Sequence, residues 1–149
     1  KATIGPQITD GVILSHGGQF SGYSLYVKDG RLTMSIMDVP SPLYWNRLTP
    51  TRTIFTAESP LESGKPYEVT GTLLKDGTVR LAVDGSEVAQ GRSKTLSIHP
   101  AGPMQLGVSP PRYVPIGEYT PPFLFKGQIQ QVTVEFGGDE VESTSTKEE

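Results

Sequence analysis

The sequence predicts an all-β protein built as an antiparallel β-sandwich, and three observations carry this prediction. Apolar and polar residues alternate over short segments, which is typical of strands with one wet face. Asp-Gly pairs follow such segments at Asp29-Gly30, Asp76-Gly77 and Asp84-Gly85. Asp-Gly is the preferred type I′ hairpin turn, because both residues tolerate positive φ. No segment longer than about two turns has the apolar 3.6-residue period of a helix.

Ten strands are expected, joined by turns and loops that contain most of the 17 Gly and 13 Pro residues. In chain order, the expected ranges are Thr3–Gln7, Gly11–His16, Tyr23–Lys28, Arg31–Met37, Thr53–Ala57, Tyr67–Lys75, Thr78–Val83, Glu87–Arg92, Met104–Val108 and Gly127–Phe136.

The first hairpin illustrates the alternation on which these ranges depend. Leu25 and Val27 fall on one face of their strand, while Tyr26 and Lys28 fall on the other. The glycines of the preceding link are interpreted as a tight connection. They are not interpreted as a phosphate cradle, because no helix follows to supply a dipole.

The second hairpin, Tyr67–Val83, repeats the pattern. Apolar residues and Gly71 occupy alternate positions, and the positions between them are polar, namely Glu68, Thr70 and Thr72. The pattern predicts one face of the sheet against the core and one face in water.

The last expected strand changes parity partway along. One parity holds Phe125, Gly127 and Ile129, and the other holds Val132, Val134 and Phe136. One extra residue near Gln130-Gln131 would place both apolar sets on the core face. The sequence therefore predicts a β-bulge there.

Two long loops contain many prolines, which argues against central strands. Asp38–Arg52 holds three prolines and the only Trp, and Ser109–Pro122 holds five prolines. The tail from Gly137 is acidic and nearly free of large apolar residues, so we expect residues 137–149 to be disordered. Residues 1–136 are expected to form a single sandwich domain.

Composition limits the classes of function. A net charge of −3 gives no electrostatic reason to expect nucleic acid or an anionic membrane as a partner. No apolar run approaches the ~20 residues of a spanning helix. The absence of cysteine excludes disulfides, zinc–thiolate sites and cysteine nucleophiles. Because Lys1 is the first residue and no signal peptide is visible, the chain is interpreted as a fragment or a processed product.

Candidate hydrolytic and metal sites are weak. No expected strand carries the alternating carboxylates of a sandwich-type glucanase, and no catalytic residue is assigned. His16 precedes Gly17-Gly18 at a strand end and is interpreted as a hydrogen-bonded structural residue. Calcium binding is possible but cannot be assigned to particular ligands; the loop-edge candidates are Asp29, Asp38, Asp76 and Asp84.

The two Pro-rich loops contain the best candidate for a binding surface. Aromatic rings stack on sugar faces, and Arg pairs with sulfate in bidentate fashion. The same residue types anchor protein interfaces. We favour docking onto another domain over glycan binding. The alternative to any binding role is that these rings fill the end of the sandwich. The candidate residues are Tyr44, Trp45, Arg47, Arg52, Arg112, Tyr113 and Tyr119.

Three segments together resemble the C-terminal region of bacterial arylsulfatases: GVILSHGGQFSGYSLYVKDGRL, LESGKPYEVTGTLLKDGTVRLAVDGSEVAQGR and FKGQIQQVTVEF. The resemblance spans roughly Gly11–Phe136 and is most specific over Gly22–Leu32. It implies a jelly-roll-type sandwich of the laminin G-like or concanavalin A-like kind. Gln130 and Gln131 stand where the closing strand of that fold commonly has an acidic pair.

The resemblance implies a non-catalytic accessory domain that packs against the sulfatase catalytic domain of the same polypeptide, in a periplasmic or secreted enzyme. The sulfatase signature itself is missing. Its nearest match is Leu48-Thr49-Pro50-Thr51-Arg52, where Leu48 has no group to oxidise. The alternatives are a carbohydrate-binding module for anionic or sulfated glycans and, less favoured, a glucanase-like hydrolase.

Overall fold

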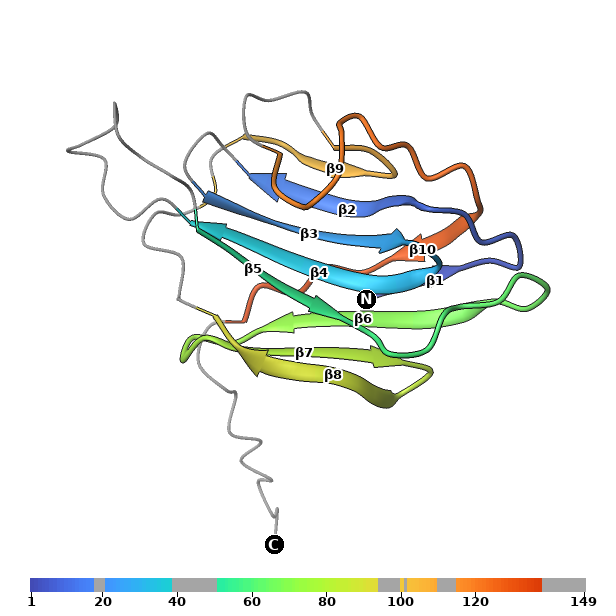
Figure 1. Ribbon diagram of the computed structural model, residues 1–149, viewed down its shortest axis with the longest axis horizontal. Helices are drawn as coiled ribbons and strands as arrows, with labels where there is room; N and C mark the ends of the chain where they lie inside the picture. The colour runs from blue at the N-terminus through green and yellow to red at the C-terminus, as the bar shows by residue number, and fades with distance from the viewer. Residues whose placement is uncertain (18–20, 39–50, 94–99, 101, 110–114, 138–149) are drawn as a thin grey trace, which may run out of the picture.

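The computed structural model describes residues 1–17, 21–38, 51–93, 100, 102–109 and 115–137. These residues form an all-β structure of two five-stranded antiparallel sheets without a helix, which is a β-sandwich (Figure 1). Sheet A has the order β10-β1-β6-β7-β8, and sheet B has the order β5-β4-β3-β2-β9.

All ten expected strands are present, with ends that differ by a few residues. They are β1 (Ala2–Ile4), β2 (Gly11–Gly17), β3 (Ser21–Lys28), β4 (Arg31–Asp38), β5 (Thr51–Thr56), β6 (Tyr67–Leu73), β7 (Thr78–Val83), β8 (Ser86–Arg92), β9 (Met104–Leu106) and β10 (Ile129–Val132). The largest differences are at β1 and β10, which are shorter than expected.

One main core fills the space between the sheets. Sheet B contributes residues of one parity, such as Leu25, Val27 and Met34, and sheet A contributes Val69 and Leu81. The apolar residues that alternate along β3 and β6 therefore face the core, as the sequence predicts. Close approach of the sheets needs a small residue at Gly71, where a Cβ atom would lie 2.9 Å from the Met34 sulfur.

Two of the three Asp-Gly turns have the predicted backbone. Asp29 and Gly30 have φ of 52° and 74°, and Asp84 and Gly85 have φ of 49° and 79°. The prediction is wrong at Asp76-Gly77, where only Gly77 has a positive φ, of 88°. There the Gly77 N–H donates to the Leu74 carbonyl (3.0 Å), which makes a longer loop of a type I turn followed by a left-handed glycine.

The predicted β-bulge is confirmed. Thr3 pairs with Gln131 and Ile4 pairs with Ile129, so Gln130 is the extra residue on β10. Ile129 and Val132 both pack against the main core. The bulge thus turns residues of opposite parity to the same face, as the apolar pattern requires.

The outer face of sheet B is the main departure from the expected half-wet sheet. Tyr26, which the alternation places on the polar face, has no exposed surface, and most of β2, β3 and β4 is buried on both faces. The segment Pro115–Phe125, which we call the strap, supplies the covering contacts.

Candidate functional site

The strap lies over a row of polar side chains on the outer face of sheet B. Gln105, Ser15, Ser24 and Ser35 are successive neighbours across β9, β2, β3 and β4. The three serines have no exposed surface. A buried hydroxyl needs a partner, and the strap and the segment before it provide one for each serine.

Each serine uses a different partner. Ser15 Oγ donates to the Val108 carbonyl (2.8 Å), and Ser35 Oγ donates to the Ile116 carbonyl (2.8 Å). The Tyr119 hydroxyl lies 3.0 Å from Ser24 Oγ and 2.9 Å from Ser109 Oγ. The polar row therefore serves as a set of anchor points for covering backbone.

Apolar contacts hold the strap between these anchors. Ile116 is fully buried above the pair Gly17 and Gly22, where added Cβ atoms would approach its Cδ1 to 3.1 and 3.2 Å. These glycines, which the sequence indicates as a tight link, also leave a pit for Ile116. Further along, Tyr119 stacks on Phe123 with ring centroids 5.0 Å apart.

Hydrogen bonds tie the strap to the strands that it crosses. Arg52 Nε on β5 donates to the Pro115 carbonyl (2.8 Å), and Lys28 Nζ on β3 donates to the Glu118 carbonyl (2.6 Å). The Val12 N–H on β2 donates to the Phe123 carbonyl (2.9 Å). This part of the outer face is therefore closed by the protein itself.

Burial under the strap changes the titration of two tyrosines. It raises the pKa of Tyr26 to about 12, and the backbone N–H of Glu118 opposes the shift without a hydrogen bond of good geometry. Burial also raises the pKa of Tyr119, against the effect of its bonds to Ser109 and Ser24. Both phenols stay neutral at physiological pH and act as packing groups.

Two of the seven predicted binding residues lie in the described part of the chain. Tyr119 is buried, so its ring faces are taken up by packing on Tyr26 and Phe123. Arg52 is half-buried at the edge of sheet B. The others lie outside the described residues: Tyr44, Trp45, Arg47, Arg112 and Tyr113.

The described flanks of the two Pro-rich loops lie together. Ser21, Asp38 and Thr51 are neighbours at one end of β3, β4 and β5, on the left in Figure 1. Arg52, which follows the first loop, bonds to Pro115 within the second. Both candidate loops are thus anchored at the same end of sheet B.

His16 lies at this end too, and its contacts fit the structural interpretation. Its Nδ1 is 3.0 Å from the Tyr23 hydroxyl, and the two rings meet edge to face at 5.4 Å. The Phe136 ring lies at 6.5 Å on another side.

Two of the loop-edge aspartates accept hydrogen bonds from backbone N–H groups. Asp84 Oδ1 accepts from the Glu68 N–H (2.9 Å), and Asp76 Oδ1 accepts from the Thr78 N–H (2.8 Å). The turn at Asp29 is held by a residue that the sequence did not single out, Asp10, whose carboxylate accepts the N–H of Asp29 and of Gly30 at 2.9 Å each. Within the described ranges, no three acidic or histidine side chains form a group suited to a metal.

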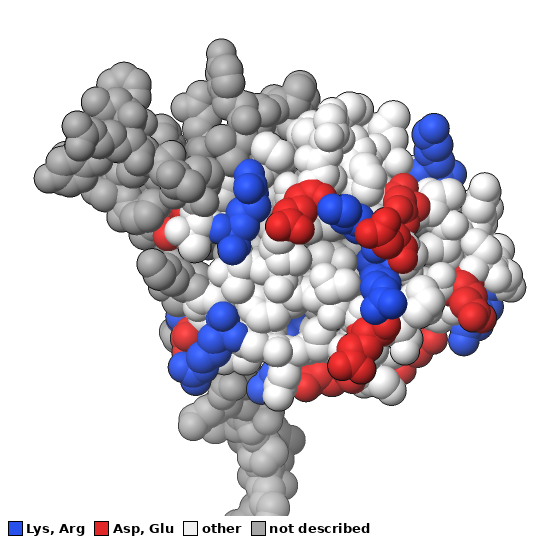
Figure 2. Space-filling model, in the orientation of Figure 1, with Lys and Arg blue, Asp and Glu red and all other residues white. Residues whose placement is uncertain are grey.

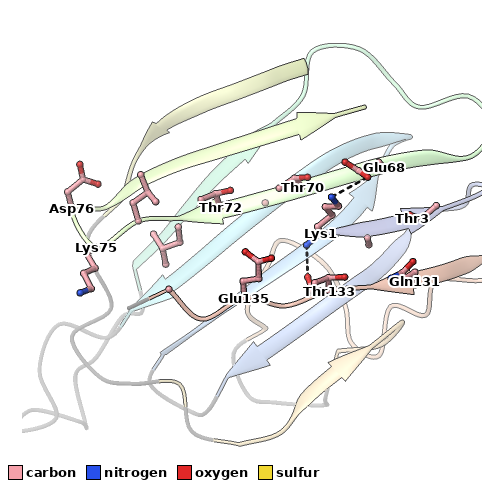
Figure 3. A pocket seen from close by; sticks show the side chains of 15 residues that line it. Lys1, Thr3, Glu68, Thr70, Thr72, Lys75, Asp76, Gln131, Thr133 and Glu135 are labelled. Carbon is pink, nitrogen blue, oxygen red and sulfur yellow. Dashed lines mark hydrogen bonds and ion pairs between the residues drawn. The ribbon is translucent and has the colours of Figure 1, made fainter. Parts of the chain in front are cut away.

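A hollow of about 1320 Å³ lies on sheet A, and the sequence did not predict it (Figure 3). Lys1 lies at its mouth, with Nζ 3.4 Å from Glu68 Oε2 and the α-amino group 2.9 Å from the Thr133 carbonyl. Burial lowers the pKa of that α-amino group, and Glu135 and Glu68 oppose the shift. The lining comes from β1, β6 and the segment around and after β10, which lie far apart in the chain.

Charges on the face in Figure 2 are mixed, with Lys and Arg interspersed among Asp and Glu. Arg80 lies 3.9 Å from Glu87, and Arg92 lies 3.8 Å from Asp76. Among the described residues of this face, charges of opposite sign therefore lie close together and partly offset each other.

No protein-family model matches the chain, and no curated protein matches it. In the part of the chain that the structure describes, no helix is long and apolar enough to cross a membrane.

Proposed function

We propose that the chain is a non-catalytic accessory domain of an arylsulfatase-like enzyme, and that it packs against the catalytic domain of the same polypeptide. In this proposal the sandwich is of the jelly-roll type, laminin G-like or concanavalin A-like, and the parent enzyme is periplasmic or secreted. The docking surface is the end of sheet B from which the two Pro-rich loops leave. There the domain would shape access to the substrate.

The observation that carries the proposal is the bond from Arg52 to the Pro115 carbonyl. It joins the described flanks of two loops that are far apart in sequence. The two loops carry Tyr, Trp and Arg, which are the residue types enriched among interface anchors. Backbone restricted by proline lowers the entropy cost of docking.

Closure of the outer face of sheet B favours docking over glycan binding. An open sheet face with rings at its rim would suit a sugar, but Ile116, Tyr119 and Phe123 occupy this face. The rings of Tyr119 and Phe123 stack on each other and so offer less free surface to a ligand.

Binding measurements on Trp45→Ala test the proposal. We expect the chain to bind a separately produced catalytic domain of an arylsulfatase of this type, and the variant to weaken binding by at least about tenfold, since an aromatic anchor contributes ~2–4 kcal/mol. Arg80→Ala, on the distant exposed face of β7, is the matched control and should bind normally.

Calorimetry against sulfated and neutral oligosaccharides covers the rival function. We expect no binding heat, and no turnover of aryl sulfates or polysaccharides by the isolated chain. Millimolar or tighter glycan binding that disappears in Trp45→Ala would replace docking with carbohydrate binding. Turnover abolished by changing one carboxylate would make the chain a hydrolase.

A further inference from the structure

Strand β5 (Thr51–Thr56) forms one edge of sheet B (Figure 1). β4 pairs with it on one side, and no described strand pairs with it on the other. The Ala57 N–H donates to the Leu32 carbonyl (2.9 Å), so the odd-numbered residues of β5 bond to β4. The direction of the backbone groups alternates along an antiparallel ladder. The residues that direct their N–H and C=O groups away from the sheet are therefore Arg52, Ile54 and Thr56.

The other sheet edges formed by the described strands have features that hinder pairing. β9 spans only three residues. β10 spans four residues and contains the bulge at Gln130. β8 has an extra residue at Val88, which breaks the register of its pairing with β7. Natural sheets avoid edge-to-edge pairing by such short strands and bulges. In contrast, β5 pairs with β4 in regular register over all six of its residues.

The composition of β5 favours pairing with another strand. Its residues other than Arg52 are Thr, Ile and Phe, which are β-branched or aromatic and fit strands well. The strand contains no Pro or Gly. Arg52 carries its only charge, and the Nε atom of Arg52 is already bonded to the Pro115 carbonyl (2.8 Å). A segment with high β-propensity and low net charge is typical of strands that pair with copies of themselves.

A second copy of β5 fits this edge when Ile54 lies opposite Ile54 of that copy. Arg52 then lies opposite Thr56 of the second copy, so the outward N–H and C=O groups of all three residues find partners. The two Ile54 side chains meet on the outer face. On the other face, where Phe55 packs against the core, Phe55 would lie beside Thr53 of the second copy. Aromatic and β-branched side chains form favourable cross-strand pairs.

The residues that flank β5 favour this register over its neighbours. A shift by two residues in one direction would place Ile54 opposite Pro50, and a shift in the other direction would place Arg52 opposite Pro60. Proline has no N–H to donate, so each shift loses a hydrogen bond. In the register centred on Ile54, Arg52 lies diagonally across from the exposed Glu58 of the second copy. The two-fold symmetry repeats this pair of opposite charges.

We propose that β5 is a self-association edge, at which two copies of the chain pair antiparallel about a two-fold axis at Ile54 and join their B sheets. The contact uses the same edge on both copies, so pairing closes as a dimer. One strand from each copy makes a small contact. The dimer is therefore transient, with a dissociation constant on the order of 10–100 µM. This proposal does not rest on the proposed docking function.

Sedimentation equilibrium of the whole chain tests the association. We expect a monomer–dimer equilibrium. Ile54→Pro removes an outward N–H without removing a bond within sheet B, and should weaken association by at least about tenfold. Ile54→Lys keeps the backbone intact but places like charges opposite each other, and should also weaken association.

The matched control for these variants is a proline at another edge. The Ser93 N–H donates to the Gly77 carbonyl (2.8 Å), so the alternation along β8 directs the Gln90 N–H away from sheet A. Gln90→Pro should therefore dimerise as the unchanged chain does. Slow amide exchange in β3 of each variant checks that sheet B remains folded, so that loss of the dimer is distinguished from unfolding.

Disulfide cross-linking tests the register. The chain has no cysteine, so one introduced cysteine can link only two copies. Opposite residues of a hydrogen-bonded antiparallel pair have Cα atoms about 5.5 Å apart, within the range of a disulfide. Ile54→Cys should therefore cross-link on mild oxidation. Thr56→Cys is the control on the same edge, because its two copies would be offset by about 13 Å along the strands, which is too far for a disulfide.

Three results would overturn the proposal. A chain that stays monomeric up to about 1 mM would exclude a second copy as the occupant of this edge. Unchanged dimerisation of folded Ile54→Pro and Ile54→Lys would place the contact elsewhere. Cross-linking of Thr56→Cys that is as efficient as that of Ile54→Cys would contradict the register.

Discussion

Tyr26 and Tyr119 meet edge to face under the strap, with ring centroids 4.9 Å apart, but their hydroxyl groups differ in what they do for stability. The Tyr119 hydroxyl is bonded to Ser24 and Ser109. The Tyr26 hydroxyl is buried and has no hydrogen bond of good geometry within the described residues. Removing a bonded group and removing an orphaned group have opposite consequences for the free energy of unfolding.

Replacing each tyrosine by phenylalanine separates these two effects. We expect Tyr119→Phe to lower the free energy of unfolding by about 1–3 kcal/mol, because Ser24 and Ser109 lose a buried partner. Tyr26→Phe should leave it unchanged or raise it by up to about 1 kcal/mol. Urea unfolding of the two variants checks the pair, and equal losses would contradict the assigned hydroxyl roles.

Alkaline pH should loosen the same cluster. Burial raises the pKa of Tyr26 to about 12, from the ordinary value of 10.0. The folded state therefore keeps a proton that the unfolded state loses, and stability falls as pH rises from about 10 to about 12. We expect Tyr26 to account for roughly 1–3 kcal/mol of this fall. Urea unfolding at several pH values should show a shallower decline in Tyr26→Phe; identical declines would contradict the assignment.

At the scale of elements, the strap depends on glycines that let backbone approach backbone. Gly11 has φ of 147°, and a Cβ atom there would lie 2.4 Å from the Phe125 Cα atom at the end of the strap. The next residue, Val12, bonds to Phe123. A side chain at Gly11 would therefore push the strap away from the start of β2.

Gly11→Ala tests this dependence against Gly64→Ala. Both glycines have positive φ, but a Cβ atom at Gly64 meets nothing within 4 Å. We expect Gly64→Ala to cost about 1 kcal/mol of backbone strain and Gly11→Ala to cost about 2 kcal/mol more. Exchange of the Val12 N–H should quicken only in Gly11→Ala. Equal behaviour of the two variants would show that strap contact at Gly11 does not matter.

For the whole molecule, the two sheets share one core, because its buried residues come from both sheets. Leu81 on β7 is fully buried in this core, whereas Leu106 on β9 is 54% exposed. A substitution that destabilises sheet A should therefore destabilise sheet B as well. Unfolding should be a single cooperative transition.

Leu81→Ala tests this coupling. We expect a loss of about 2–5 kcal/mol in the free energy of unfolding, and the same loss for the slowest-exchanging amides of β3 in sheet B. Leu106→Ala should change stability by less than about 0.5 kcal/mol. Amides of β3 that keep their protection in Leu81→Ala would mean that the sheets unfold separately.

The sequence by itself determined the features that depend on local backbone preference and on side-chain alternation. The strands, the turns at Asp29-Gly30 and Asp84-Gly85, and the bulge at Gln130 belong to this class. Each follows from φ preferences of a few residues or from which parity is apolar, so neighbours in the chain suffice to predict them.

The tertiary structure alone decided which surfaces are covered and which are left open. The alternation along β3 predicts that Tyr26 faces water. In the structure the strap, about ninety positions later in the chain, packs over it. The sequence predicts that Gly17 and Gly22 belong to a tight link. In the structure they also make room for Ile116, which lies above them. These features depend on contacts between residues far apart in the chain, and a pattern of period two carries no information about them.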